Sequence, residues 1–272
     1  MVKINNKIYA KLETYNPSGS IKDRMAYYIL TEAKKTWHLK PNNTIVEATS
    51  GNTGIAMSML GAAMGHPVII IMPRNMSEER KCMMRTYGAK IIEVGDNAFK
   101  DAIELRDKMC NENENYFNPK QFTNPDNIRC HKLTTGNEII RQCPDLSAFI
   151  AGSGTGGTLM GVNQMLKIAR KDAKIIQVQP EEGNATHGIQ GINDGEDFLL
   201  DKSIVDDVIY VKTADAIKRA KRLAKEKGLL VGISSGANVL AAERWVEENN
   251  PERPVVTILC DRGERYFSCY ED

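Results

Sequence analysis

The sequence is poor in the residues that build metal centres and disulfide frameworks. It has four histidines and six cysteines in 272 residues, without a Cys-x-x-Cys pair and without histidines at metal-ligand spacing. Scattered cysteines of this kind are typical of free thiols in a reducing compartment. We therefore expect no bound metal and no disulfide scaffold.

Long apolar runs and charge of one sign are missing as well. The longest run of branched side chains, Val68 to Ile71, is far shorter than the roughly 20 residues that span a bilayer. The first residues lack the apolar core of a signal peptide. Lys and Arg total 36 against 35 Asp and Glu, and no basic run marks a nucleic-acid track. We expect a cytoplasmic protein with small-molecule partners and no nucleic-acid or membrane partner.

Strand-like and helix-like segments alternate along the chain, which is 42% hydrophobic and large enough for one large or two medium domains. Strands are predicted at 7–12, 44–48, 67–72, 90–94, 148–151, 174–179, 206–211 and 255–259. Helices are predicted between them, including 55–64, 77–87, 99–111, 131–141 and 214–227, and residues 184–201 are predicted to form a loop. This alternation predicts an α/β protein with parallel sheets covered by helices on both faces.

A turn rich in helix-start signals runs from Asn16 to Arg24. Proline and glycine favour a turn there, and Ser18 or Ser20 is expected to cap the helix that follows. Lys22 falls in the first turn of that helix, where the positive end of the helix dipole disfavours an ammonium group. Such a lysine is either a solvated surface residue or one with a depressed pKa and a task, such as a Schiff base with a carbonyl cofactor.

The glycine-rich stretch from Gly152 to Thr158 follows a predicted strand and opens a predicted helix. Its backbone N–H groups and the helix dipole make an anion site suited to a phosphate. The stretch also matches the dinucleotide pattern G-x-G-x-x-G, with Asp172 or Glu181 placed to bind a ribose, so a dinucleotide is the competing hypothesis. Hydroxyl donors at Thr155 and Thr158 favour a terminal phosphate.

Two further loops place polar groups at strand ends. The loop from Thr49 to Gly54 suits a carboxylate, or is a turn in which Ser50 or Asn52 caps the helix. The loop from Gly232 to Gly236 offers a hydroxyl to a pyridine nitrogen, or is a plain helix cap. A serine at that nitrogen leaves it largely unprotonated, which favours elimination over reactions that need a long-lived carbanion.

Together these stretches resemble the cysteine synthases, the O-acetylserine sulfhydrylases of the β-family (fold type II) of pyridoxal-phosphate enzymes. Five motifs carry the resemblance, in the family's order over nearly the whole chain: Asn-Pro-Ser-Gly-Ser-Ile-Lys-Asp-Arg at 16–24, Thr-Ser-Gly-Asn-Thr-Gly at 49–54, Gly-Thr-Gly-Gly-Thr at 154–158, Gly-Ile-Ser-Ser-Gly at 232–236 and Gly-Glu-Arg-Tyr at 263–266. Residues 179–183 and 260–263 look like the B isozyme, whereas residues 187–191 are similar to the A isozyme.

The resemblance implies two three-layer αβα domains with mostly parallel sheets, as in the β subunit of tryptophan synthase. Residues 15–125 would form a smaller substrate-binding domain, and residues 1–14 with 126–272 a larger cofactor-binding domain. The family has an additional N-terminal strand before the segment at Lys7, which this chain lacks, so we expect marginal stability or unusual self-association.

The resemblance also implies a role for each site residue. Lys22 would hold pyridoxal 5′-phosphate as a Schiff base and move the substrate's α-proton. The substrate carboxylate would be bound by Thr49, Ser50, Gly51, Asn52, Thr53 and Gln121, with Asn52 also near the cofactor's 3′-oxygen. The phosphate would be bound by Gly154, Thr155, Gly156, Gly157 and Thr158, and Ser234 would face the pyridine nitrogen.

The implied reaction is β-replacement, in which O-acetylserine loses acetate and bisulfide adds to form cysteine. A homodimer is implied, and serine acetyltransferase is a possible partner. Three alternatives stay open: a related enzyme that degrades cysteine or makes lanthionine or cystathionine, a dinucleotide-binding oxidoreductase, and a truncated, catalytically silent paralogue that acts as a binding protein.

Overall fold

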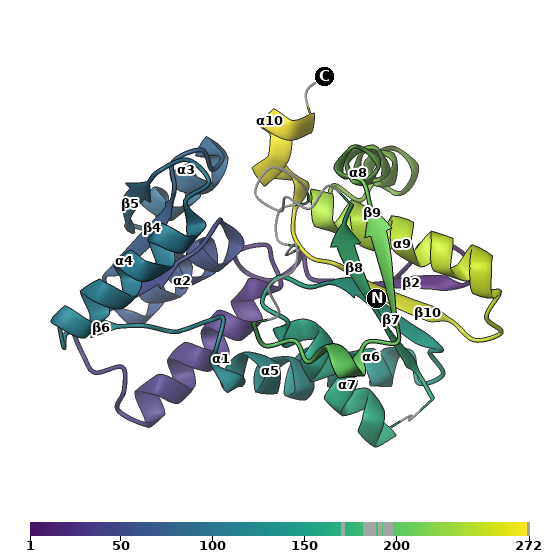
Figure 1. Ribbon diagram of the computed structural model, residues 1–272, viewed down its shortest axis with the longest axis horizontal. Helices are drawn as coiled ribbons and strands as arrows, with labels where there is room; N and C mark the ends of the chain where they lie inside the picture. The colour runs from purple at the N-terminus through teal and green to yellow at the C-terminus, as the bar shows by residue number, and fades with distance from the viewer. Residues whose placement is uncertain (170–171, 182–188, 190–191, 193–197, 271–272) are drawn as a thin grey trace. The chain divides into compact units, whose positions relative to one another are not determined.

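The computed structural model describes residues 1–169, 172–181, 189, 192 and 198–270 (Figure 1). The chain divides into two compact units: unit 1 comprises residues 1–15 and 122–272, and unit 2 comprises residues 16–121. The loop predicted at 184–201 lies largely outside the described residues.

Unit 2 is built on a four-stranded parallel sheet. Its strand order is β5-β4-β3-β6, with β3 at Thr44–Ala48, β4 at Val68–Pro73, β5 at Lys90–Val94 and β6 at Tyr116–Phe117. The helices of the unit are α1 (Lys22–Lys35), α2 (Asn52–Met64), α3 (Glu78–Thr86) and α4 (Phe99–Glu112). The strands β3 and β4 are almost continuously buried because both faces of a parallel sheet are covered.

The two faces of this sheet carry separate cores. Ile45 and Ile70 pack with side chains of α1 and α2, such as Met25 and Ile55. Their neighbours along the strands point to the opposite face, where Val46, Ala48, Ile69 and Ile71 pack with Ala102 of α4. The unit therefore has three layers, helix, sheet and helix.

Unit 1 is built on a six-stranded sheet in the order β1-β2-β10-β7-β8-β9. The strands are β1 (Val2–Lys3), β2 (Ile8–Leu12), β7 (Ala148–Gly152), β8 (Lys174–Pro180), β9 (Asp207–Val211) and β10 (Val255–Leu259). Only the pairing of β1 with β2 is antiparallel among these neighbours. Parallel strand ends thus lie along one edge of the sheet, where the loops after β7 and β10 emerge.

Helices cover both faces of this second sheet (Figure 1). On one side lie α8 (Thr213–Lys227) and α9 (Ile233–Asn249), whose apolar side chains, such as Leu223 and Val239, share a core with the strands. On the other side lie α5 (Pro125–His131), α6 (Asn137–Gln142) and α7 (Gly157–Ala169). A π-helix at Lys132–Gly136 joins α5 to α6, and the short α10 is at Phe267–Tyr270. This three-layer arrangement with mostly parallel sheets confirms the predicted fold class.

Several element boundaries differ from those predicted. Helix α2 begins at Asn52, three residues before the predicted start at Ile55, because Gly51 occupies the cap position and the polar residues after it enter the first turn. Helix α5 begins at Pro125, before the helix predicted to start at residue 131, because Asn124 caps it by accepting the Asp126 N–H. The strands β1 and β6 were not predicted, since two residues carry no periodicity.

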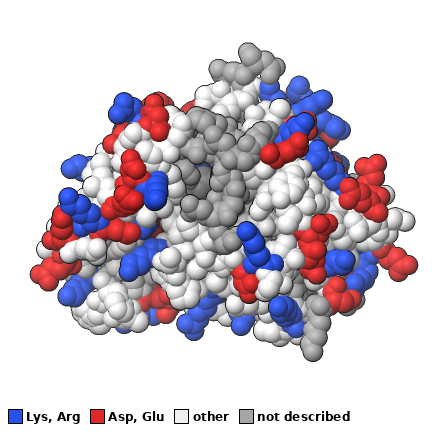
Figure 2. All heavy atoms as spheres, in the orientation of Figure 1, with Lys and Arg blue, Asp and Glu red and all other residues white. Residues whose placement is uncertain are grey.

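The surface mixes charges of both signs, as Figure 2 shows for one face of the molecule. Oppositely charged neighbours account for part of this pattern. Arg222 lies 2.8 Å from Glu226 one turn further along α8, and Arg253 lies 2.8 Å from Asp172. Exposed pairs of this kind contribute little to stability.

Candidate active site

Lys22 is the first residue of α1, directly after the predicted turn. Gly19 has φ of +87°, and its N–H donates to Asn16 O at 2.7 Å, which closes the turn. The Lys22 N–H donates to Ser20 Oγ at 3.3 Å. Ile21 occupies the helix cap position, so the prediction that Ser18 or Ser20 occupies it is wrong.

Ser18 instead binds Asp23, in the first turn of α1. Its N–H donates to Asp23 Oδ2 at 2.6 Å, and its hydroxyl donates to the other carboxylate oxygen. Both residues are buried, and a carboxylate in the first turn of a helix is favoured by the helix dipole. These contacts hold the turn that precedes Lys22, whose own side chain is half-buried.

The loop between β3 and α2 contains the predicted carboxylate-binding residues. Thr49 Oγ1 accepts a hydrogen bond from the Gly51 N–H at 3.1 Å, and neither Ser50 nor Asn52 caps the helix. The first N–H groups of any α-helix have no partner within the helix. At the start of α2, no side chain of the cap residue binds them. The start of α2 is therefore suited to a negatively charged ligand.

Gln121 meets this loop, although it is distant in the sequence. Its Oε1 accepts a hydrogen bond from the Thr53 hydroxyl at 2.7 Å, and its Nε2 donates to Ala48 O at 3.0 Å. Both Thr53 and Gln121 are buried. The structure therefore brings together the two ends of the predicted carboxylate site within unit 2.

The glycine-rich loop of unit 1 connects β7 to α7, which begins at Gly157. Gly156 has φ of +86°, and a Cβ added there would lie 2.5 Å from Leu200 N. A Cβ at Gly157 would lie 2.1 Å from Asn127 Oδ1. These two positions accept only glycine, so the loop's backbone N–H groups stay accessible at the helix start.

Two residues of α5 support this loop, and the sequence analysis missed both. Asn127 Nδ2 donates to Thr155 Oγ1 at 2.9 Å, and His131 Nε2 shares a hydrogen bond with Thr158 Oγ1 at 3.3 Å. Both are buried and stand four residues apart, so they lie on one face of α5. In the sequence, the four-residue spacing of Asn127 and His131 after Asn124, a typical helix-capping residue, indicates two polar side chains on one face of a helix.

Ser234 lies in the first turn of α9. It is buried, and its hydroxyl has no hydrogen-bond partner among the described residues. The neighbouring Ser235 is used structurally, since its Oγ accepts the Cys260 N–H at 2.9 Å. Asn238, one turn along α9, accepts the Gly152 N–H at 2.8 Å and so ties α9 to the end of β7.

Comparison with known proteins decides which cofactor this geometry serves. A family model described as pyridoxal-phosphate dependent enzyme matches residues 2–261. The chain belongs to the pyridoxal-phosphate-dependent enzymes. It is 41% identical to the cysteine synthase of Staphylococcus aureus (strain Mu50), over 96% of this chain and 87% of that protein. It is 40% identical to cysteine synthase B of Escherichia coli (strain K12), over 97% of this chain and 87% of that protein.

A solved structure extends the similarity to the fold. The crystal structure of a hydrogen sulfide-producing enzyme from Fusobacterium nucleatum matches with a TM-score of 0.90 at 41% identity, covering 96% of this chain and 82% of that chain. The pyridoxal-phosphate-dependent enzyme described here is therefore of the cysteine synthase type, which confirms the resemblance and the predicted cofactor.

Family membership favours pyridoxal phosphate over the dinucleotide hypothesis for the loop at 152–158. The two acids considered as ribose ligands are engaged elsewhere in this pyridoxal-phosphate enzyme. Asp172 pairs with Arg253 at 2.8 Å, and Glu181 lies 3.6 Å from Lys212.

Every helix in the described ranges is too short or too polar to cross a membrane.

Proposed function

We propose that this enzyme forms L-cysteine and acetate from O-acetyl-L-serine and sulfide. The observation that carries the proposal is the junction of Thr53 and Gln121 at the open start of α2, in the same unit as Lys22. The junction fixes the start of α2, whose backbone N–H groups suit an amino-acid carboxylate. The similarity to cysteine synthases of two bacteria supports the choice of reaction.

The described residues fit the cofactor. The loop from Gly154 to Thr158 offers backbone N–H groups and hydroxyls that suit the phosphate, and added Cβ atoms at Gly156 and Gly157 would collide with the surrounding protein. Ser234 is a buried hydroxyl without another described partner, which suits the pyridine nitrogen. When bound, pyridoxal phosphate supplies an electron-withdrawing ring that acidifies the substrate's α-carbon.

Each proposed role then follows from the chemistry of a side chain. Lys22 Nζ would hold the cofactor through its aldehyde carbon, and its free amine would accept the proton that leaves the substrate's α-carbon. The loop at 49–53 and Gln121 bind and orient the carboxylate, so that the bond from the β-carbon to acetate can break. Ser234, as a neutral partner, would leave the ring nitrogen largely unprotonated, which would favour elimination of acetate over reactions that need a long-lived carbanion.

Replacing Lys22 by alanine tests the proposal. We expect cysteine formation to fall by at least about 10³-fold, since the amine acts both as the covalent anchor and as the base. Borohydride reduction of the wild-type protein should fix the cofactor to the peptide containing Lys22. Lys34→Ala, at an exposed position of the same helix, is the matched control and should keep full activity. A Lys22→Ala protein with wild-type turnover would disprove the assignment.

The similarity to a hydrogen sulfide-producing enzyme supports a second candidate, the release of sulfide from L-cysteine. Both reactions use the same carboxylate and cofactor contacts, so the site geometry favours neither. The comparison of kcat/KM for O-acetylserine with sulfide against kcat/KM for cysteine alone decides between them. We expect the first value to be larger.

A further inference from the structure

Glu47 is a buried carboxylate next to the loop that we assign to the substrate carboxylate. It is the fourth residue of β3, two residues before Thr49, and it is 0% exposed. Its Oε1 accepts hydrogen bonds from the Ala48 N–H and from Arg106 Nη1, both at 2.9 Å, and its Oε2 accepts the Gln121 N–H at 3.4 Å. Burial raises the pKa of Glu47, and Arg106 acts in the opposite direction.

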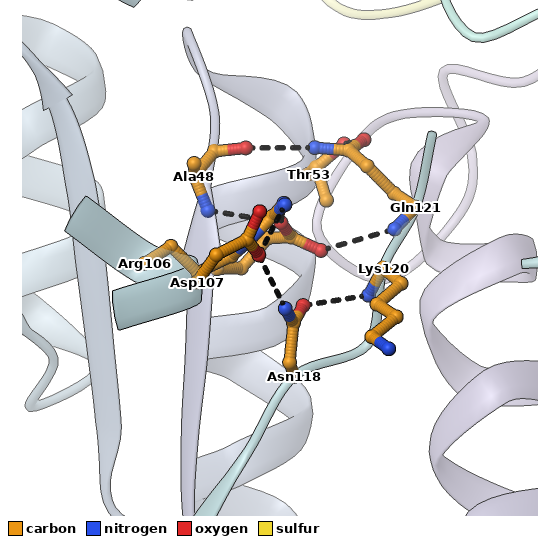
Figure 3. Close-up of polar contacts among 8 residues, drawn as sticks. Ala48, Thr53, Arg106, Asp107, Asn118, Lys120 and Gln121 are labelled. Atoms are coloured by element: carbon orange, nitrogen blue, oxygen red, sulfur yellow. Dashed lines mark hydrogen bonds and ion pairs between the residues drawn. The ribbon is translucent and has the colours of Figure 1, made fainter. Parts of the chain in front are cut away.

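Arg106 of α4 lies between two carboxylates. Besides Glu47, it contacts Asp107, whose Oδ1 accepts from Arg106 Nε at 2.9 Å and from Nη2 at 2.8 Å. The same Asp107 oxygen accepts from Asn118 Nδ2 at 3.0 Å (Figure 3). Because Arg106 is itself buried, it joins a buried acid and a half-exposed one through one planar group.

The two carboxylates hold the two ends of one short segment, from Asn118 to Gln121. Asp107 binds the Asn118 side chain, and Glu47 binds the Gln121 backbone N–H. Between them, Asn118 Oδ1 accepts the Lys120 N–H at 2.9 Å, and Lys120 has φ of +55° (Figure 3). A lysine adopts this left-handed conformation only when its surroundings impose it.

The end of this segment carries the Gln121 side chain to the loop after β3. Its amide bridges Ala48 O and the Thr53 hydroxyl, so its orientation sets the orientation of Thr53 (Figure 3). A continuous set of hydrogen bonds therefore runs from Arg106 through Glu47 to Gln121 and Thr53. All of these residues lie in unit 2.

Stability alone does not explain a buried ion pair at this position. Removing two charges from water costs free energy, and well-packed apolar side chains of similar volume often stabilise a protein as much or more. What the pair supplies, and apolar side chains would not, is an acceptor for the Gln121 N–H and an anchor for Asn118. Its specific contribution is therefore the placement of the segment at 118–121.

We propose that Arg106 and Glu47 are positioning residues for the α-carboxylate of the amino-acid substrate, acting through Gln121 and Thr53. This inference rests on the proposed function, because it takes the loop at 49–53 as the carboxylate site. The two residues do not contact the substrate. They keep the joined side chains of Gln121 and Thr53 in place, and these in turn hold the loop at 49–53 that receives it.

The test measures carboxylate binding without turnover. L-alanine has the α-carboxylate and α-amine of the substrate but no leaving group on its β-carbon. We expect Arg106→Met to weaken its binding to the holoenzyme at least about tenfold by calorimetry, and to raise the KM for O-acetylserine similarly while kcat changes less than about threefold. Lys108→Met is the matched control, because Lys108 is an exposed residue of the same helix, and it should change none of these values.

A second pair of variants separates positioning from folding. Arg106→Lys keeps a charge near Glu47 but cannot contact both carboxylates through a planar group, so it should fold and bind L-alanine with intermediate affinity. The double variant Glu47→Gln with Arg106→Met removes both charges, so it should fold and still bind weakly. Equal dissociation constants in the wild type and in these folded variants would overturn the proposal.

The same measurements distinguish failure of this inference from failure of the proposed reaction. If the wild type makes no cysteine from O-acetylserine but Arg106→Met still loses L-alanine affinity, the positioning role stands and the proposed reaction fails. If cysteine is made at the wild-type KM by a folded Arg106→Met protein, the reaction stands and the positioning role fails. Amide hydrogen exchange in the peptide 118–121 should rise in Arg106→Met and stay unchanged in Lys108→Met.

Discussion

At the scale of single residues, the glycines of the β7–α7 loop show how local shape is decided by distant neighbours. An alanine Cβ at Gly157 would meet Asn127 Oδ1 at 2.1 Å, and one at Gly156 would meet Leu200 N at 2.5 Å. By contrast, a Cβ at Gly65 or Gly88 would have no atom within 4 Å, and glycine there serves only the positive φ. The two loop glycines therefore keep backbone and neighbouring side chains close, which is what an anion site built from N–H groups needs.

The buried Glu47 makes a prediction about stability and pH. A carboxyl group whose pKa is raised in the folded state binds its proton more tightly there than when unfolded. Its contribution to stability is therefore greatest at low pH and falls as pH rises from the usual value of a carboxyl through the raised pKa. Arg106 and Cys110 of α4 are titratable groups that interact with Glu47.

Removing Arg106 takes away the main positive charge that opposes this rise. We expect the melting temperature of Arg106→Met to fall more steeply than that of the wild type over the pH range above the usual pKa of a carboxyl group. The double variant that also carries Glu47→Gln lacks the carboxyl and should not show this fall. A constant difference between the two variants across the range would contradict the assignment of the effect to Glu47.

The residues of the candidate site were predictable to different degrees. Lys22, the loop at 49–54 and the loop at 152–158 stand in local patterns of turn, hydroxyl and helix start, so neighbouring residues in the sequence indicate them. Glu47 and Arg106 were not predictable, because they are 59 residues apart and neither belongs to a local motif. The only signal in the sequence is a charged residue, Glu47, in a predicted strand, and this signal does not indicate that Arg106 is its partner.

At the scale of elements, strands were predicted better than helix starts. The bounds at 44–48, 90–94 and 255–259 agree with the structure, because apolar branched runs end sharply at polar turns. Helix starts depend on which residue accepts the first N–H groups. Here Asn124 does so one residue before a proline, and Gly51 occupies the cap of α2 without a side-chain bond.

The end of α1 offers a test of backbone conformation. Thr36 is the C-cap residue of α1. Trp37 follows it, has φ of +60° and is 68% exposed. Glycine is favoured at this position, since a Cβ is strained in the left-handed region. The backbone of Trp37 is therefore strained, and the small buried area of the indole compensates little for that strain.

We expect Trp37→Gly to stabilise the protein by about 0.5–1 kcal/mol, because the strain removed exceeds the added flexibility of the unfolded chain. Trp37→Ala keeps a Cβ and so keeps most of the strain, which makes it the matched control. Urea denaturation of the three proteins measures the difference. A Trp37→Gly protein no more stable than Trp37→Ala would contradict the assignment of strain to the Cβ, and two variants that are both less stable than the wild type would mean that the indole makes a stabilising contact.

At the scale of the whole molecule, the chain is organised as two units, each with its own sheet and core. The chain enters unit 2 once, after residue 15, and returns to unit 1 once, after residue 121. Residues 8–12 form β2, which pairs with β10 at 255–259, so the start of the chain belongs to the sheet formed by its second half. The alternation of strands and helices predicted parallel sheets but not this pairing, since it joins residues far apart in the sequence.

Two separate cores predict that a destabilising change in one unit is felt mainly within that unit. Arg106→Met leaves a buried carboxylate unpaired in unit 2 and should cost about 3–5 kcal/mol there. Native-state hydrogen exchange should therefore accelerate in β3, α2 and α4, with little change in β7 and β10. The reciprocal change, Leu223→Ala in the core of unit 1, removes buried methyl groups at a cost of about 2–5 kcal/mol and should accelerate exchange in α8, α9 and β10 but not in β3. If either substitution accelerated exchange equally in both sheets, the two units would unfold as one cooperative block, and the two cores would not be energetically separate.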